Sequence, residues 1–444
     1  AYMFEQLSTF QTDSEKGFAY IFILLFSMPI RKHHSPDLTN PFYYFENAYG
    51  EEKNHFFNSI DLRDLHKYLK NLSIDYVPAF HHDIFSGLNL DENYKKPFLR
   101  MFLEKIDSFP LYSLIKMNSS LLTIADYIAT SRYMWDQELK IKGIIHQDLK
   151  KRISDSFYSK YTYNADLKNK KKPYDFKELK KRSNKNLNEL RFKLAFDVRE
   201  NLLQNQNYNN NLFFLEAPTG GGKTNLSFMA AAELLEKRPE LNKVFYVFPF
   251  TTLVTQTQKS LVETFGLDPE DYLELHSKAG YKENPDKDGT YGKERNNYLD
   301  YLFINYPFTL LTHIKFFDII KSHRKQDNYL YHKLANSIVI IDEIQAYSPE
   351  HWDKIYYFLK NISGLFNAVF IVMSATLPKV DKLKISKQPV FSEFFRLNQN
   401  KHEYYTNANF AQRVEFDFSL LSGSRKNSLD EIMGTLLQQS ENYA

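Results

Sequence analysis

One loop constrains this sequence more than any other feature. In FLEAPTGGGKTNLSF, from Phe214 to Phe228, three consecutive glycines, a lysine and a threonine separate an apolar run from an alanine-rich run. Leu212 to Leu215 predict a buried strand, and TNLSFMAAAELLEKR predicts a helix that begins near Thr224. A strand, a glycine-rich turn and a helix N-terminus bind phosphate, because backbone N–H groups converge there and the helix end is positive. The loop therefore predicts an α/β fold with a phosphate site.

The loop also predicts which ligands are bound. The residues expected to cradle the phosphates are Pro218, Thr219, Gly220, Gly221, Gly222, Lys223 and Thr224. Lys223 would reach the β- and γ-phosphate oxygens, and Thr224 would offer its hydroxyl to Mg²⁺. Ala217 stands where the strict GxxxxGK[ST] pattern has its first glycine, and this A-x-T-G-x-G-K-T variant is typical of helicases. ATP and Mg²⁺ are the expected ligands, and a glycine-rich turn without nucleotide is the alternative.

Two further strings supply polar groups at the ends of predicted strands. NSIVIIDEIQAYS ends a buried strand with Asp342 and Glu343, at the sheet edge where open α/β sheets bind ligands. Asp342 is expected to hold Mg²⁺, and Glu343 to polarise the water that attacks the γ-phosphorus. VFIVMSATLP brings Ser374 and Thr376 to the end of another strand, where their hydroxyls could couple the state of the nucleotide to the rest of the protein.

The hydrophobic pattern divides the chain into several domains. Residues 1–160 repeat apolar residues at helical spacing and predict an all-α domain. Residues 161–190 are rich in lysine and predict a basic linker, or a contact with a phosphate backbone. Residues 191–390 alternate short β-branched and aromatic runs with helical segments, which predicts a parallel sheet covered by helices. Residues 391–444 are expected to contain the connection to a second lobe or the start of that lobe.

Composition excludes several classes of protein. The 444 residues include no cysteine, which excludes a disulfide framework, a zinc ribbon and thiol catalysis, and suits a reducing cytoplasm. The formal net charge is only +3, so any affinity for nucleic acid must come from local basic surfaces. The most apolar run, Phe18 to Ile30, is shorter than the roughly 20 residues that cross a bilayer. We therefore expect a cytoplasmic protein without a membrane partner.

The three strings resemble motifs I, II and III of superfamily 2 helicases and translocases, which implies a RecA-like lobe over about 191–390. FPFTTLVTQT then resembles motif Ia, with Thr251 and Thr252 as candidate donors to backbone phosphates. LLTHIKFFD stands where motif Ib is expected, with Thr312 and His313 as candidates. Threonine-rich loops at strand ends are also ordinary α/β structure, and that alternative stays open.

The helical half contains a possible second site. KHHS, with His33 and His34, and the later ADYIATS, with Asp126, resemble the last ligands of an HD-type phosphohydrolase domain, whose pattern is H…HD…H…HH…D. Imidazole and carboxylate without sulfur fit Mn, Fe, Co or Ni and phosphodiester chemistry. An exposed surface pair of histidines is the alternative. The dipeptide in FHHDIF, at His82 and Asp83, follows His33 and His34 and so reverses the order of the family.

The combination of an HD-type domain, APTGGGKT and DEIQ resembles the CRISPR-associated helicase-nuclease of type I interference. The resemblance implies recruitment by an RNA-guided surveillance (Cascade-type) complex, ATP-driven translocation on single-stranded DNA, and cutting at the HD site. It also implies earlier histidine ligands and a later arginine-bearing lobe, so we expect the natural protein to extend beyond both ends. A degenerate nuclease is the alternative explanation for the absence of the earlier histidines. Two other hypotheses stay open: a superfamily 2 RNA helicase or ATP-gated remodelling switch with a non-catalytic helical module, and a nucleotide-binding structural subunit without turnover.

Overall fold

The structure, a computed structural model, describes residues 108–135, 143–169, 171–275, 303–322, 324–375, 394–411 and 434. In these residues a single parallel sheet has seven strands in the order β3-β4-β2-β5-β6-β1-β7. The strands are β1 (Leu212–Glu216), β2 (Lys243–Phe248), β3 (Tyr272–Leu275), β4 (Phe308–Thr312), β5 (Ser337–Ile341), β6 (Val369–Ser374) and β7 (Phe395–Arg396). The parallel sheet predicted from the short apolar runs is therefore confirmed.

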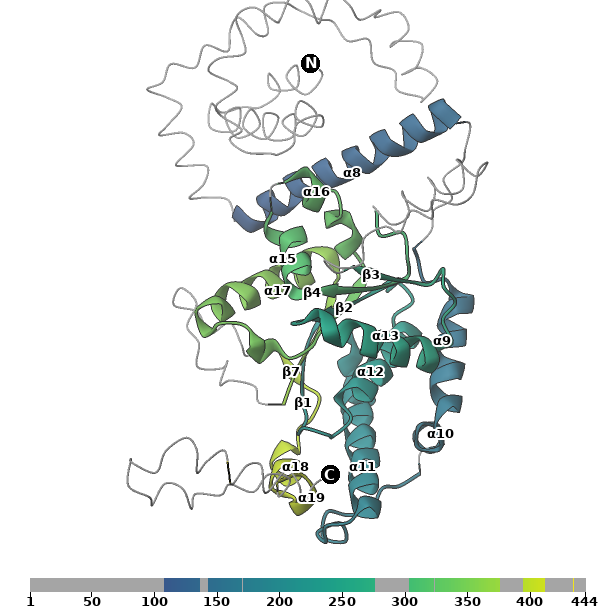
Figure 1. Cartoon of the computed structure of the whole chain (residues 1–444), viewed down its shortest axis with the longest axis vertical. Coiled ribbons are helices and arrows are strands. Elements are labelled where there is room, and N and C mark those ends of the chain that lie inside the picture. The colour runs from purple at the N-terminus through teal and green to yellow at the C-terminus, as the bar shows by residue number, and fades with distance from the viewer. Residues whose placement is uncertain are drawn as a thin grey trace, which may run out of the picture.

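Helices cover both faces of this sheet (Figure 1). One face carries α9 (Gln147–Lys160), α10 (Thr162–Lys168), α11 (Asn184–Leu203), α12 (Lys223–Lys237) and α13 (Thr251–Phe265). The other carries α8 (Ser108–Trp135), α15 (His313–Lys321) and α17 (Trp352–Phe366), and the short α16 (Lys325–Asn328) packs on α8 and α15. The short helices α18 (Lys401–Thr406) and α19 (Ala408–Ala411) lie beyond β1, beside α11. Such a three-layer arrangement is that of a RecA-like domain.

Alternation along the strands explains the two cores. In β2, Val244, Tyr246 and Phe248 belong to the core under α12 and α13, whereas Phe245 and Val247 belong to the core under α15 and α17. Successive side chains of a strand point to opposite faces, so a strand buried on both sides reads as one continuous apolar run. This is why KVFYVF and SIVII could be recognised from sequence.

The lysine-rich stretch 161–190 packs on the sheet-bearing domain. It contains α10 and the start of α11, and its leucines Leu167 and Leu179 are buried in the same core as α11 and α12. Preceding it, α9 packs on α12 and α13. Tyr158 of α9 and Arg199 of α11 both donate to the buried carboxylate of Glu233, with Arg199 Nε 2.6 Å from Oε1. A buried carboxylate with two such donors fixes how these three helices meet.

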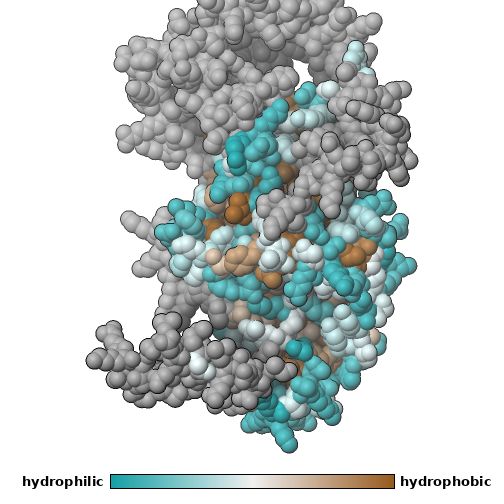
Figure 2. All heavy atoms as spheres, viewed as in Figure 1, coloured by the Kyte–Doolittle hydropathy of each residue, from teal (hydrophilic) through white to brown (hydrophobic). Residues whose placement is uncertain are grey.

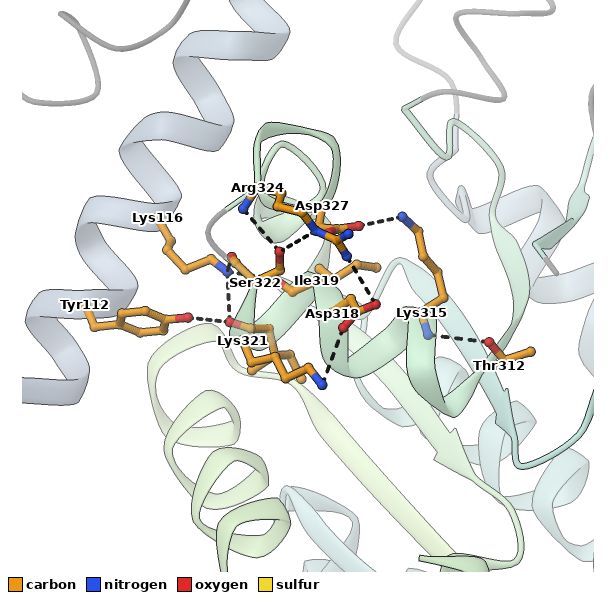
Figure 3. A network of polar contacts seen from close by, with 11 residues as sticks. Tyr112, Lys116, Thr312, Lys315, Asp318, Ile319, Lys321, Ser322, Arg324 and Asp327 are labelled. Carbon is orange, nitrogen blue, oxygen red and sulfur yellow. Dashed lines mark hydrogen bonds and ion pairs between the residues drawn. The ribbon is translucent and has the colours of Figure 1, made fainter. Parts of the chain in front are cut away.

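Helix α8 is fastened to α15 by a buried amine (Figure 3). Lys116 is 3% exposed, and its Nζ donates to the carbonyl oxygens of Ile319, Ile320 and Ser322 at 3.0, 2.8 and 2.7 Å. Tyr112 donates to the Ile320 carbonyl at 2.6 Å. The last carbonyls of a helix have no partners inside the helix, so these side chains cap the carboxyl end of α15.

Residues 1–107 lie outside the described residues, and so do the predicted HD-type ligands among them. The all-α HD-type domain therefore stays a prediction, as do the predicted domain boundaries. Within the described part of the chain, no helix is both long and apolar enough to cross a membrane. Hydrophilic residues cover much of the described surface in the view of Figure 2.

Candidate active site

The glycine loop between β1 and α12 has a backbone conformation that favours glycine at three positions. Gly220 and Gly222 have φ angles of 77° and 85°, in the left-handed region where glycine carries no Cβ penalty. Gly221 donates its N–H to the Pro218 carbonyl at 2.8 Å, and a Cβ at Gly221 would lie 2.9 Å from that oxygen. Gly220 and Gly222 are thus favoured by their backbone conformation, and Gly221 by the close approach of the Pro218 carbonyl.

The amino end of α12 faces open space. Gly222 is the N-cap, it has no capping side chain, and a Cβ built on it meets none of the described atoms within 4 Å. The first N–H groups of a helix lack partners within the helix and carry partial positive charge. Together with the Lys223 ammonium, this is an environment that fits a polyphosphate.

The two acids predicted for this site lie beside the loop. Lys223 Nζ lies 2.6 Å from Glu343 Oε1, and their side chains are 14% and 28% exposed. Glu343 has a φ of 48°, an uncommon value for a residue with a Cβ, and its N–H donates to Asp342 Oδ1 at 2.9 Å. The turn after β5 therefore directs both carboxyl groups toward the first residue of α12.

The carboxyl group of Asp342 is poorly solvated. Burial, and secondly the charge of Glu343, raise the pKa of Asp342 to about 6 against the opposing charge of Lys223. A carboxylate that is costly to ionise in isolation is stabilised by a cation placed beside it. The carboxyl group of Asp342 and the hydroxyl of Thr224, the residue after Lys223 in α12, are oxygen ligands of the kind that Mg²⁺ prefers.

His313 contacts the main chain of this acid pair, at Asp342. It is 5% exposed, its Nε2 lies 3.1 Å from the Asp342 carbonyl oxygen, and its ring stacks on Tyr347 at 4.2 Å. Burial lowers the pKa of His313 to about 4, so the ring is neutral at pH 7, and Nε2 carries a proton because a carbonyl can only accept. The burial of His313 does not suit the contact with nucleic acid expected from sequence.

Gln345, the last residue of DEIQ, joins the second and third motifs, and sequence analysis assigned it no role of its own. Its Nε2 donates to Glu343 Oε2, and its Oε1 accepts from the Ser374 hydroxyl. A chain of bonds thus runs from Lys223 through Glu343 and Gln345 to Ser374. The sequence signal for Gln345 was its place in the DEIQ motif. Thr376 lies outside the described residues.

A cavity of about 440 Å³ adjoins the glycine loop. Gly221 and Gly222 line one side of it, and Tyr163, Arg191 and Phe192 of α10 and α11 line the other. Arg191 also donates through Nε to the Gly220 carbonyl at 2.8 Å, which ties α11 to the loop. These three residues stand in the stretch that sequence analysis interpreted as linker and in the following helix, where no motif distinguishes them.

The threonines predicted to contact nucleic acid lie at the same edge of the sheet. Thr251 and Thr252 begin α13, directly after β2, and Thr252 is exposed. Thr312 is the N-cap of α15, and its hydroxyl accepts from the Lys315 N–H at 3.4 Å. Because β2 and β4 pair with Phe248 opposite Thr312, both threonine-bearing turns are neighbours in space.

Of the predicted nuclease ligands, the structure describes only Asp126. It lies half-buried on α8, whereas His33 and His34 lie outside the described residues, as do His82 and Asp83. Among the described residues, no group of three or more histidines and acids could hold a metal ion. The HD-type metal site is therefore neither assembled nor excluded by these residues.

Residues 198–383 match the family model for DEAD/DEAH box helicases, so the chain contains a DEAD/DEAH box helicase domain. The sequence has no significant match among curated proteins. Similar solved structures include the crystal structure of T. fusca Cas3-AMPPNP, with 14% identity, a TM-score of 0.41, and coverage of 68% of this chain and 35% of that chain. For T. fusca Cas3-ATP the identity is 14%, the TM-score 0.41, and the coverage 84% and 46%. The match thus spans less than half the length of those chains.

Proposed function

We propose that this chain is the ATP-binding part of an ATP-dependent single-stranded DNA translocase that is coupled to a metal-dependent nuclease. The observation that carries the ATP-dependent part is the meeting of Lys223, Glu343 and Asp342 at one edge of the sheet. The helicase domain at residues 198–383 supports the same activity. The link to foreign-DNA degradation and to an RNA-guided surveillance complex rests on the combined resemblance of APTGGGKT, DEIQ and the HD-type residues.

In this proposal the glycine loop binds the phosphates and Lys223 changes partner. Its ammonium is bonded to Glu343, and the oxygens of a bound triphosphate would compete for that ammonium. Glu343, once released, is free to accept a proton from the attacking water. Thr224 and Asp342 would hold Mg²⁺, which when bound neutralises charge on the phosphates. The cavity beside Tyr163 and Phe192 would receive the nucleoside.

The nuclease half of the proposal assigns His33, His34 and Asp126 as ligands of a transition metal. The DNA-facing half assigns Thr251, Thr252 and Thr312 to backbone phosphates, because they lie on neighbouring strand ends. His313 is proposed to position Asp342 instead of contacting DNA. Ser374 is proposed to report the state of the nucleotide through Gln345.

The test uses the natural full-length protein with circular single-stranded DNA, ATP and a series of divalent metals. We expect DNA degradation that requires both ATP and metal. Lys223→Ala should abolish both DNA degradation and ATP hydrolysis, whereas His33→Ala should abolish DNA degradation and leave ATP hydrolysis intact. Unwinding of RNA without metal-dependent cutting would instead favour a remodelling helicase. Full biological activity of both Lys223→Ala and Glu343→Gln would indicate a structural subunit and contradict the proposal.

A further inference from the structure

The residues 394–411, here called the C-terminal segment, contact the active edge of the sheet although they belong to none of the motifs. They comprise β7, α18 and α19. β7 adds to the sheet beside β1, with Phe395 opposite Phe213 and with the Leu397 N–H donating to the Phe214 carbonyl at 2.9 Å. In Figure 1 the segment continues from β7 to α18 and α19, next to α11.

The first contact of the C-terminal segment is with Glu216, the last residue of β1. Glu216 is 5% exposed, and Arg396 and Lys401 place nitrogens 2.5 and 3.2 Å from its carboxylate oxygens. Asn398 donates to the Glu216 carbonyl at 2.8 Å. Glu216 directly precedes Ala217 and Pro218, so these bonds set where the glycine loop begins.

The second contact is with the Ser-Ala-Thr turn. The Tyr405 hydroxyl donates to the carbonyl oxygen of Ala375. Ala375 follows Ser374, whose hydroxyl is bonded through Gln345 to Glu343. β1 and β6 are adjacent, with Glu216 opposite Ser374. One short helix therefore reaches the ends of the two strands that lead into the phosphate loop and into the third motif.

Further contacts anchor the C-terminal segment to α11 and to the turn that precedes α11. Tyr404, the neighbour of Tyr405, donates to Asp197 of α11 at 2.8 Å. Asn409 donates to the Leu179 carbonyl at 3.1 Å and accepts from the Ser183 N–H at 2.9 Å. Adjacent tyrosines thus make different bonds: Tyr404 joins the segment to α11, and Tyr405 joins it to the active edge.

We propose that the C-terminal segment couples the ATP site to the part of the chain that follows Ala411, with Tyr405 as the positioning residue. The inference rests on the proposed ATP-dependent function. Asn398 bonds to the Glu216 carbonyl, where the glycine loop begins, and Tyr405 bonds to the Ala375 carbonyl, in the turn after Ser374. A shift of the segment must therefore move the start of the glycine loop and the Ser374 turn together. A rearrangement of those turns around phosphate must equally move the segment, since coupling of this kind is reciprocal.

The test compares Tyr405→Phe with Tyr404→Phe in the natural full-length protein. Each variant loses one hydroxyl and its hydrogen bond from the same helix, to Asp197 in Tyr404→Phe and to the Ala375 carbonyl in Tyr405→Phe. We expect Tyr405→Phe to reduce the stimulation of ATP hydrolysis by single-stranded DNA at least 5-fold, while basal hydrolysis and the KM for ATP stay within about 2-fold. Tyr404→Phe should keep the stimulation within about 2-fold. Undiminished stimulation in Tyr405→Phe, or an equal loss in both variants, would overturn the proposal.

A second measurement uses the 444-residue chain and needs no turnover. Amide hydrogen exchange is recorded over residues 394–411 with and without Mg²⁺ and a slowly hydrolysed ATP analogue. We expect the analogue to change exchange in the parent and in Tyr404→Phe, and to leave it unchanged in Tyr405→Phe although the analogue still binds. The same response in Tyr405→Phe as in the parent would sink the coupling alone. Absence of binding in the parent would sink the proposed function itself, so the two failures are distinguishable.

Discussion

The two ends of α15 lie in chemically different regions, although each end meets a buried base. At the amino end, His313 bonds to the Asp342 carbonyl, next to the carboxyl groups of Asp342 and Glu343, which belong to the proposed ATP site. At the carboxyl end, Lys116 bonds to three backbone carbonyls that do not titrate. Burial lowers the pKa of Lys116 to about 7 against the opposing charge of Asp327.

This difference distinguishes the proposed catalytic site, where Lys223 lies, from the structural contact between α8 and α15, where Lys116 lies. Lys223 is partly exposed and has one carboxylate partner, so a stronger anion can compete for it. Lys116 is enclosed by main-chain acceptors and by the rings of Tyr112 and Tyr331, 5.4 and 4.8 Å from its Nζ. A buried lysine is therefore a candidate for function when its partner can leave, and burial alone does not show this.

The largest expected effect is at the amino end, from Glu343→Gln in the full-length protein. Loss of the general base should lower ATP turnover by about 10²- to 10⁴-fold, because an amide cannot accept the proton. ATP hydrolysis at saturating DNA is the measurement. Glu350→Gln, an exposed acid seven positions later, is the matched control and should stay within about 2-fold. If Glu343→Gln turned over ATP at nearly the rate of the parent, Glu343 would not be the general base.

The next effect is on stability, from Asp342→Asn. The pKa of Asp342 is about 6 in the folded protein against an ordinary value of 3.8, so the folded state binds more protons between these values. The ionised carboxyl group of Asp342 therefore destabilises the folded state fully above about pH 6, and this destabilisation disappears as the pH falls toward 3.8. Asp342→Asn should therefore raise the free energy of unfolding by about 1–3 kcal/mol at pH 7.5. This gain should be about 1 kcal/mol smaller at pH 5, as measured by denaturant unfolding.

At the carboxyl end, Lys116→Met removes the donor to three carbonyls. Buried acceptors without donors destabilise a protein by about 1–3 kcal/mol, and part of this is offset because the variant no longer buries an amine. We therefore expect the free energy of unfolding to fall by about 1–2 kcal/mol. ATP affinity should change less than 2-fold. Lys321→Met, at an exposed side chain in the last turn of α15, is the control and should change stability by under about 0.5 kcal/mol. Stability of Lys116→Met equal to that of Lys321→Met would contradict the structural role.

The smallest effect is expected from His313→Phe, which keeps the ring against Tyr347 and removes one hydrogen bond to Asp342. A neutral hydrogen bond contributes about 0.5–1.5 kcal/mol, which corresponds to a decrease of about 3- to 10-fold in ATP turnover if the bond positions Asp342. Tyr347→Phe is the control, because the Tyr347 hydroxyl has no hydrogen-bond partner among the described residues. Equal turnover in both variants would show that His313 only fills space.

The fold around the site followed from local sequence because strands buried on both faces are nearly continuous apolar runs. The runs in β1, β2, β5 and β6 predicted these strands, and the glycine loop predicted the start of α12. β7 was not predicted, because Phe395 and Arg396 form a strand only through pairing with β1. The packing of α9 on α12 and α13 could not be predicted either, since helical periodicity shows that a face is buried but not against what.

The candidate site shows the same limit. Lys223, Asp342 and Glu343 were predicted because each directly follows a strand or turn of recognisable pattern. Gln345 and Arg191 were missed, since their importance lies in contacts across the fold, to Ser374 and to Gly220. Burial of His313 depends on the ring of Tyr347, which is distant in sequence.

The central claim is that a triphosphate replaces Glu343 as the partner of Lys223, and titration of Mg·ATP into matched variants of the 444-residue chain tests it most directly. We predict that Glu343→Gln binds ATP as tightly as the parent or more tightly, because Lys223 no longer has a carboxylate partner. Lys223→Ala should bind at least about 100-fold more weakly, as expected for loss of a charged phosphate contact worth about 3 kcal/mol. Equal affinities in the two variants, or unchanged affinity in Lys223→Ala, would contradict the account.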